Sequence, residues 1–241
     1  LKYVRKAHNM DANLMDVYMP MGLMEYFSCL SSAPVKWAAK IAGLETDCEA
    51  GLQYLQKAAL QSHYSWIEAS NVLTYAYLHI QRDYEKCLQF IDPLVEEFPG
   101  HPFFAFMQAE LYAKTEKWDR LELIMPSLEK FAASGPYLQK NECQLKLAYI
   151  RGLKAFYHGN YAESLKQTDW ILENYHMEFD WLKGFTFLLQ GKCYDILGDR
   201  KSAKKAYKEV LKMDGYYPEV EEGKAYLKEP YIPELVSIDN K

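Results

Sequence analysis

Apolar residues along most of this chain recur every three to four positions, which is the period of one face of an α-helix. No segment shows the strict alternation of apolar and polar residues that is typical of a β-strand. We therefore expect helix in more than about 60% of the chain, well above the usual third, and essentially no strand. The predicted helix pairs are 15–31 with 47–62, 66–80 with 84–98, 102–115 with 118–133, 137–158 with 161–175, and 180–197 with 200–213.

Three segments lie outside these pairs. A short helix at 34–42 falls within an insertion at 32–46, and a capping helix at 218–228 follows the last pair. The final segment, 229–241, carries two prolines, which do not continue a helix, so we expect it to be extended. Its apolar residues predict that it packs along the inner face of the helices, on a neighbouring molecule, or simply over the last helix pair.

The stretch GKCYDILGDRKSAKKAYKEVL near the C-terminus indicates how the two helices of a pair are joined. Gly198 can take the left-handed conformation that ends a helix, and Asp199 can cap the helix that follows. Gly191 and Ala203 are small enough for two helices to approach closely, and Tyr207 fills the space beside them. The stretch predicts a tight turn between antiparallel helices that touch through small residues.

The same arrangement recurs earlier in the chain. Gly159 lies 39 residues before Gly198, and two earlier turns place Glu116 and Arg82 at the same position. The small residue ahead of the turn recurs as Gly152. Self-similarity at such a spacing indicates a repeat architecture. The predicted repeats span about 68–101, 102–144, 145–183 and 184–217.

This periodic pattern resembles the tetratricopeptide repeat, in which small residues, aromatic residues and a terminal proline hold fixed positions of a roughly 34-residue unit. In the last repeat Gly191, Tyr194, Ala203 and Tyr207 match the pattern, whereas the later positions do not. The resemblance implies an all-α fold, an α-solenoid in which antiparallel helix pairs form a right-handed superhelix. It implies one such domain over residues 1–228.

The N-terminal third fits the repeat less regularly. Residues 1–10 match the end of a repeat whose first helix is missing, so we expect the chain to be a fragment of a longer protein. The segments MGLMEYF, AGLETDCEAGLQYLQKAA and WIEA resemble a bacterial subfamily of these repeats. They are more distantly similar to the eukaryotic tetratricopeptide-39 type, which includes a mitochondrial outer-membrane protein. This resemblance covers about residues 10–125 and implies a helical scaffold without catalytic residues.

Composition narrows the function without identifying it. The net charge of −5 and the absence of a long basic run argue against nucleic-acid binding. No apolar stretch approaches the roughly 18 residues that a membrane span needs, so we expect a soluble protein. The five cysteines lie far apart without a metal-binding spacing, and we interpret them as reduced core thiols. No signal peptide is evident, and nothing in the sequence indicates a compartment or an oligomeric state.

Motifs for catalysis or cofactor binding are missing from the sequence. It contains no GxSxG, no HExxH, no phosphate-binding glycine loop and no GxGxxG after a strand. We therefore predict that the chain is not an enzyme and uses no cofactor or metal, with a catalytic region outside this chain as the alternative. Tetratricopeptide domains that grip a C-terminal carboxylate use Lys and Asn where two of these repeats hold Val72 with Ala76 and Phe106 with Glu110. A role as an adaptor for chaperone tails is therefore not expected.

The inner positions of the first helices are aromatic instead. Such a surface fits a partner helix or an extended peptide, which predicts a non-catalytic protein-interaction scaffold. Two alternatives stay open: the same side chains form part of the core, or the aromatic rings are platforms for a small molecule or a glycan. The residues predicted to contact a partner are Phe103, Phe106, Lys146, Tyr149, Phe156, Tyr157, Phe185 and Lys192.

Overall fold

The structure, a computed structural model, describes residues 2–11 and 13–233. Within these ranges it contains thirteen α-helices, a 3₁₀-helix η1 (Met15–Val17), a π-helical segment η2 (Ala76–Ile80) and no strand. Helices account for 77% of the structure, which confirms the predicted all-α class. The α-helices are α1 (Lys2–Met10), α2 (Tyr18–Leu30), α3 (Ala33–Ile41), α4 (Cys48–Gln61), α5 (Trp66–Tyr75), α6 (Tyr84–Glu97), α7 (Pro102–Lys114), α8 (Trp118–Ala133), α9 (Tyr137–Tyr157), α10 (Tyr161–Glu173), α11 (Trp181–Ile196), α12 (Arg200–Val210) and α13 (Pro218–Lys228).

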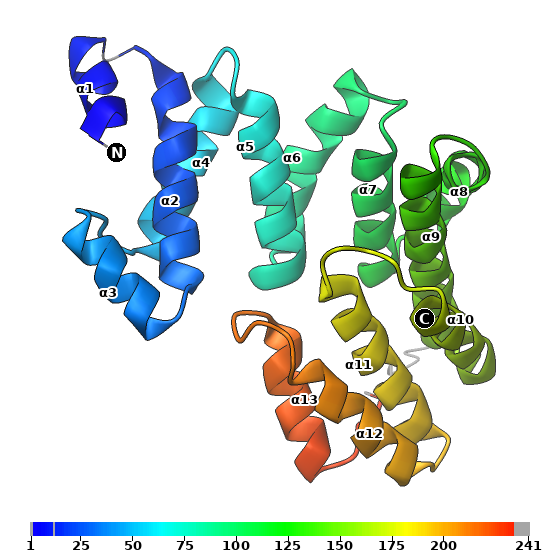
Figure 1. The fold of residues 1–241 in the computed structure, drawn as a ribbon. Coiled ribbons are helices and arrows are strands. Elements are labelled where there is room, and N and C mark those ends of the chain that lie inside the picture. The colour runs from blue at the N-terminus through cyan, green and yellow to red at the C-terminus, as the bar shows by residue number, and fades with distance from the viewer. Residues whose placement is uncertain (1, 12, 234–241) are drawn as a thin grey trace, which may run out of the picture. The chain divides into compact units, whose positions relative to one another are not determined.

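Within each compact unit, most helices pack against a helix that is close to them in the sequence (Figure 1). The chain divides into two compact units, residues 1–111 and 112–241, and the boundary falls inside α7. In the first unit α2 packs on α4, α4 on α5, and α5 on α6. In the second unit α8 packs on α9, and each helix from α9 to α12 packs on the next. The continuity of one array over residues 1–228, and its handedness, stay predictions.

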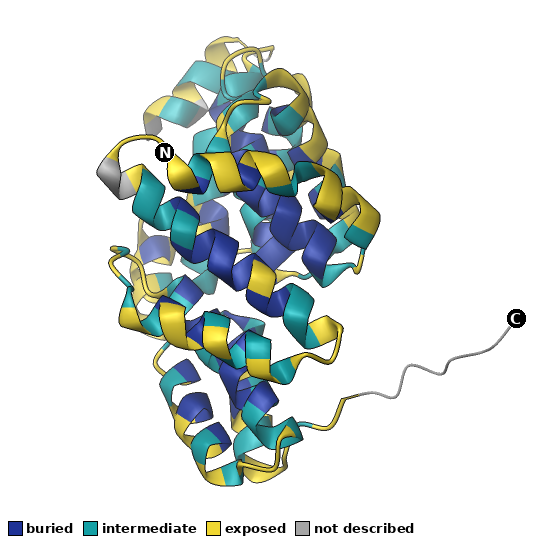
Figure 2. Cartoon of the chain, turned by 90° about the vertical axis from the view of Figure 1, so that its right-hand side faces the viewer, coloured by how far each residue is buried: buried dark blue, intermediate teal, exposed yellow. Residues whose placement is uncertain are grey.

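The core of each unit lies between these packed helices. Figure 2 shows that buried residues gather on the helix faces that are turned toward neighbouring helices. This pattern follows from the helical period of the apolar residues, which places one stripe of each helix toward its neighbours. Fully buried side chains include Tyr26, Leu55 and Leu73 in the first unit and Leu145 and Tyr207 in the second.

The turn within each of the four predicted repeats contains a residue in the left-handed conformation. The backbone angle φ is 53° at Arg82, 53° at Glu116, 74° at Gly159 and 83° at Gly198. These are the four positions that the sequence aligned with one another, and all four have the same left-handed backbone conformation. After three of them a backbone N–H donates to the carbonyl five residues earlier, which closes the end of the first helix. These bonds join Lys117 to Tyr112 at 2.9 Å, Asn160 to Ala155 at 2.8 Å and Asp199 to Tyr194 at 2.9 Å.

The second helix of three of the predicted repeats then begins with a side-chain cap. A side-chain oxygen accepts a hydrogen bond from a backbone N–H in the first turn, which satisfies a donor that has no partner within the helix. The sequence predicted this role for Asp199. The capping contacts are Asp83 to Lys86 at 3.1 Å, Asn160 to Glu163 at 3.2 Å and Asp199 to Ser202 at 3.1 Å.

Glycines allow the closest approaches between helices. A Cβ atom added to Gly191 would lie 2.4 Å from the Tyr207 ring of the paired helix, as the sequence predicted. A Cβ on Gly51 of α4 would lie 2.6 Å from the backbone nitrogen of Tyr26 in α2. Gly152 is different, because a Cβ there would meet its nearest neighbours at an ordinary 3.5 Å. The equivalent glycines of the last two repeats therefore do not have equal steric roles.

The interpretation of all five cysteines as reduced thiols is wrong for two of them. Cys29 and Cys48 form a disulfide, with their Cα atoms 5.3 Å apart. Cys29 lies near the end of α2 and Cys48 begins α4, so the packing of these two helices brings the cysteines together across the inserted α3. The 19-residue separation matches no motif, which is why sequence spacing did not reveal the bond. The other three, Cys87, Cys143 and Cys193, are free and buried, as predicted.

The C-terminal segment is extended where the structure describes it. Residues 229–233 follow α13 without helix, as their prolines predicted. Within this stretch Tyr231 lies against the second unit, whereas Ile232 is 77% exposed. The remaining apolar residues that suggested packing, from Leu235 onward, lie outside the described residues.

Replacing Gly191 with Ala is expected to lower the free energy of unfolding by about 1–3 kcal/mol, because the added methyl group must displace the Tyr207 ring. Gly152→Ala is the matched control. It meets no close neighbour and removes a flexible residue from a helix, so it should be neutral or stabilising by up to about 1 kcal/mol. Urea denaturation of both variants measures the difference. Equal free energies for the two would contradict the assigned contact.

The left-handed turn residues generate a second prediction. Glu116→Gly should raise the unfolding free energy by up to about 1 kcal/mol, because glycine takes a positive φ without steric strain. Gly198→Ala should lower it by about 1–2 kcal/mol for the opposite reason. Thermal denaturation followed by circular dichroism compares the two. A stabilising Gly198→Ala would show that this turn does not need its left-handed residue.

Candidate functional site

The eight residues predicted to contact a partner differ in exposure. Phe106, Lys146, Tyr149 and Phe185 are buried, which favours the core alternative for these four. Phe103, Phe156 and Lys192 are partly buried, and Tyr157 is 43% exposed. Phe103 and Phe106 belong to the first unit, and the other six belong to the second. Contacts among the predicted residues are therefore described within the second unit.

Phe185 on α11 is the centre of a buried aromatic cluster in the second unit. Its ring lies 5.6 Å from Trp181, 5.6 Å from Tyr217 and 6.5 Å from Tyr149 between centroids. The ammonium group of Lys114 lies 5.2 Å from the Phe185 ring centroid, within range of a cation–π interaction. Such a cluster stabilises the packing of α9 and α11, and it leaves Phe185 itself inaccessible to a partner.

Lys146 is buried beside the same cluster. Its ammonium group forms an ion pair with Glu142 at 2.6 Å, one helical turn away on α9. It also lies 5.8 Å from the centroid of the Trp181 ring. The lysine therefore neutralises a neighbouring carboxylate and packs on an aromatic face, which gives it a structural role in the folded unit.

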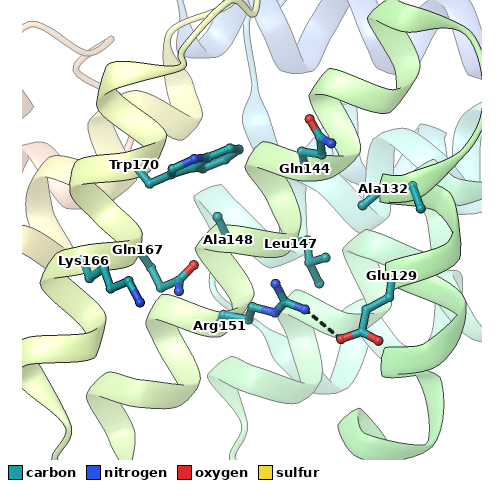
Figure 3. Close-up of a pocket in the computed structure, with 10 residues that line it drawn as sticks. Glu129, Ala132, Gln144, Leu147, Ala148, Arg151, Lys166, Gln167 and Trp170 are labelled. Carbon is teal, nitrogen blue, oxygen red and sulfur yellow. Dashed lines mark hydrogen bonds and ion pairs between the residues drawn. The ribbon is translucent and has the colours of Figure 1, made fainter.

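A groove of about 650 Å³ opens on a different part of the second unit, between α8 and α10 and above α9 (Figure 3). This volume lies within the range that small ligands and side-chain anchors occupy in binding sites. The residues that line it are Glu129, Ala132, Ala133, Gln144, Leu147, Ala148, Arg151, Lys166, Gln167 and Trp170.

The groove has an apolar floor and a mixed rim. Leu147 and Ala148 of α9 form buried parts of the floor, and Trp170 of α10 projects over it with 39% of its surface exposed. Across from Trp170, Arg151 of α9 forms an ion pair with Glu129 of α8 at 2.7 Å. The arrangement offers one aromatic face, small apolar contacts and several hydrogen-bonding groups to a ligand.

This groove and the predicted partner residues of α9 occupy opposite faces of that helix. Gln144, Ala148 and Arg151 follow one stripe at helical spacing and face the groove. Lys146 and Tyr149 lie about half a helical turn away from that stripe. None of the eight predicted residues lines the groove. The aromatic pattern of the sequence therefore pointed to the other face of the helix.

Two predicted residues, Phe156 and Lys192, meet instead around the C-terminal segment. The Tyr231 ring lies 6.0 Å from the Phe156 ring and 5.3 Å from the Tyr226 ring between centroids. The Lys192 ammonium group lies 5.1 Å from the Tyr231 centroid, and it also forms an ion pair with Glu222 at 2.8 Å. We name the three residues that surround Tyr231 the tyrosine slot: Phe156, Lys192 and Tyr226.

Asp195 is the functional candidate that sequence reasoning missed. Its side chain is 0% exposed, and it accepts hydrogen bonds from Arg200 at 2.9 Å and from the Tyr207 hydroxyl at 2.8 Å. It also accepts the backbone N–H of Tyr231 at 2.7 Å. Burial, followed by the Asp195 carboxylate, raises the pKa of Tyr207 well above its usual range, so Tyr207 stays a donor. The sequence feature that could have indicated this contact is the presence of an acid, Asp195, and an arginine, Arg200, on either side of the turn after α11.

Metal binding and thiol reactivity depend on how the cysteines, histidines and carboxylates are arranged and buried. Among the described residues, no group of three His, Cys, Asp or Glu side chains is arranged to hold a metal ion. Burial raises the pKa of the Cys193 thiol to about 11, so very little reactive thiolate forms at neutral pH. No described helix combines the length and apolar character that crossing a bilayer requires.

Comparison with known proteins adds no family assignment. No protein-family model matches the sequence, and a search of curated proteins found no similar chain. Function is therefore inferred from the geometry of the groove and of the tyrosine slot.

Proposed function

We propose that this chain is a non-catalytic scaffold of the tetratricopeptide type that binds a protein partner as a helix or an extended peptide. The observation that carries the proposal is the groove between α8 and α10, which exposes part of Trp170 above a floor of small and apolar side chains. Left-handed turns at the predicted repeat positions support the repeat class. The identity of the partner is left open.

Small residues in the groove favour a close contact with another backbone. Ala132 and Ala133 on α8 and Ala148 on α9 leave room for the side chains of an incoming segment. Trp170 is the natural anchor for such a segment, because tryptophan is enriched among the residues that dominate binding energies. An amphipathic helix or an extended peptide would place one apolar side chain beneath this ring.

The charges of the groove favour a partner segment of low net charge. Arg151 is paired with Glu129 at 2.7 Å, and Lys166 is paired with Glu163 at 3.8 Å. A strongly charged ligand would have to replace one partner of these ion pairs in order to contact an opposite charge. Because exposed pairs of this kind contribute little energy, they act mainly in selecting and orienting the partner.

A glycan or another neutral polar molecule is the second candidate ligand. The specific observation in its favour is that Gln144 and Gln167 line the groove together with the Trp170 ring. An aromatic face with amide donors and acceptors suits a ligand that presents apolar carbon faces and many hydroxyl groups. The same groove would therefore accommodate either class, and only binding experiments distinguish them.

The experiment selects peptides from a random library with the purified chain and then measures their affinity for variants. Trp170→Ala should weaken selected peptides by about 2 kcal/mol or more, roughly 30-fold, as expected for a central aromatic anchor. Leu123→Ala is the control, because Leu123 is an 81% exposed apolar residue of α8 outside the groove.

A parallel titration with neutral oligosaccharides tests the second candidate. Binding of an oligosaccharide that is lost in Trp170→Ala, with no peptide selected, would replace the scaffold proposal with the glycan one. Selected peptides whose affinity is unchanged by Trp170→Ala would contradict the groove as the binding site.

A further inference from the structure

The short segment after α13 is held by the second unit at one residue. The chain leaves the helix at Lys228 and becomes extended at Glu229, with φ −123° and ψ 139°. Three residues beyond the helix, Tyr231 is partly buried, whereas its two neighbours, Pro230 and Ile232, are exposed. Among residues 229–233, burial is therefore confined to the tyrosine.

The slot contacts the Tyr231 ring from several directions. Tyr226 on α13 meets it in a T-shaped arrangement, with an angle of 80° between the ring planes. Phe156 on α9 lies on another side, and the Lys192 ammonium group on α11 lies 5.1 Å from the ring centroid. Aromatic pairs and a cation–π contact each add favourable energy beyond apolar burial. Three helices thus build a site for one aromatic side chain.

The backbone of the same residue is bound as well. The fully buried Asp195 carboxylate accepts the Tyr231 N–H at 2.7 Å. Arg200 and Tyr207 hold this carboxylate in place, and Arg200 also donates to the Tyr226 carbonyl at 2.6 Å. A hydrogen bond to a charged acceptor is stronger than a neutral one, so a preorganised buried carboxylate is an effective receptor for a peptide N–H.

This combination recognises a peptide rather than an isolated ring. The carboxylate requires a backbone N–H at the residue whose aromatic side chain enters the slot. A proline before that residue fits this requirement, because proline favours an extended chain and its own missing N–H is not needed. Because Ile232 is exposed, the side chain that follows the aromatic residue does not contribute to recognition.

We propose that the tyrosine slot is a recognition site for an extended peptide segment centred on an aromatic residue, and that residues 229–233 occupy it as an intramolecular ligand. A protein partner with a similar aromatic segment binds by displacing Tyr231. This site lies on α9, α11 and α13, so it is separate from the groove between α8 and α10 and does not depend on the function proposed for that groove.

The short connection to α13 makes the internal ligand an effective competitor. Only two residues, Glu229 and Pro230, separate Tyr231 from the end of the helix. A ligand tethered this closely has an effective concentration of about a millimolar or more. A free peptide of similar intrinsic affinity therefore binds weakly to the natural chain and more tightly once Tyr231 is removed.

The experiment uses the full chain and a fluorescent, end-capped peptide with the sequence Lys-Glu-Pro-Tyr-Ile-Pro. In anisotropy titrations, Tyr231→Ala should bind this peptide roughly tenfold or more tightly than the natural chain, because its slot is vacated. The same peptide with alanine in place of tyrosine should not bind. Ile232→Ala is the matched control variant and should behave like the natural chain.

A second variant locates the binding site. In the Tyr231→Ala background, Lys192→Met removes the cation next to the slot while retaining an apolar side chain, and it should weaken the peptide several-fold. Unchanged affinity would place the peptide elsewhere and overturn the proposal. A Tyr231→Ala chain that remains helical by circular dichroism but binds the peptide no better than the natural chain would also overturn it. The segment would then be only a cover for the last helices.

Discussion

Everything in this structure depends on reversing the chain within a few residues while keeping the two helices of a pair in close contact. The left-handed residue ends the first helix, and in three of the four turns within the predicted repeats the N–H after it bonds back to a carbonyl five residues earlier. Because the turn is so short, it fixes which residues of the two helices face each other. Gly191 can then lie directly against Tyr207, where any side chain would collide.

A second interaction relates one helix pair to the next. Twice, a buried glutamine in a first helix donates to an aspartate in the preceding second helix, and both pairs occupy the same two positions of the predicted repeats. These contacts are Gln108 with Asp92 at 3.0 Å and Gln190 with Asp169 at 2.7 Å. At the step from α8 to α9 the residue equivalent to these glutamines is Arg151. It forms a more exposed ion pair with Glu129, three residues after the position equivalent to the aspartates, and this step contains the groove. The variation of one contact thus coincides with the candidate binding site.

The helices and turns were predictable from the sequence because their causes are local. The period of the apolar residues predicts each helix, and residues such as Gly198 and Asp199 predict where one helix ends and the next begins. The groove was not predictable, since it depends on how far α8 and α10 stand apart above the small Ala148. The sequence predicted aromatic residues at the inner positions of the first helices, but the burial and accessibility of rings such as Phe185 depend on tertiary packing.

The missed features share a physical origin. The Cys29–Cys48 disulfide and the contact of Asp195 with Tyr231 join residues that are far apart in sequence, and each requires the packed helices to bring the partners together. Neither residue type stands out where it occurs, because isolated cysteines and helix-terminal aspartates are common. Long-range contacts of this kind become visible only in three dimensions.

Native-state hydrogen exchange of the turn amides tests the central claim most directly. The account predicts that the N–H groups of Lys117, Asn160 and Asp199 exchange slowly, at rates similar to those of the helices that they close, because each is bound within its turn. Exchange of these three amides at the rate of unstructured peptides would contradict the account, because the turns would then not hold the helix pairs in register.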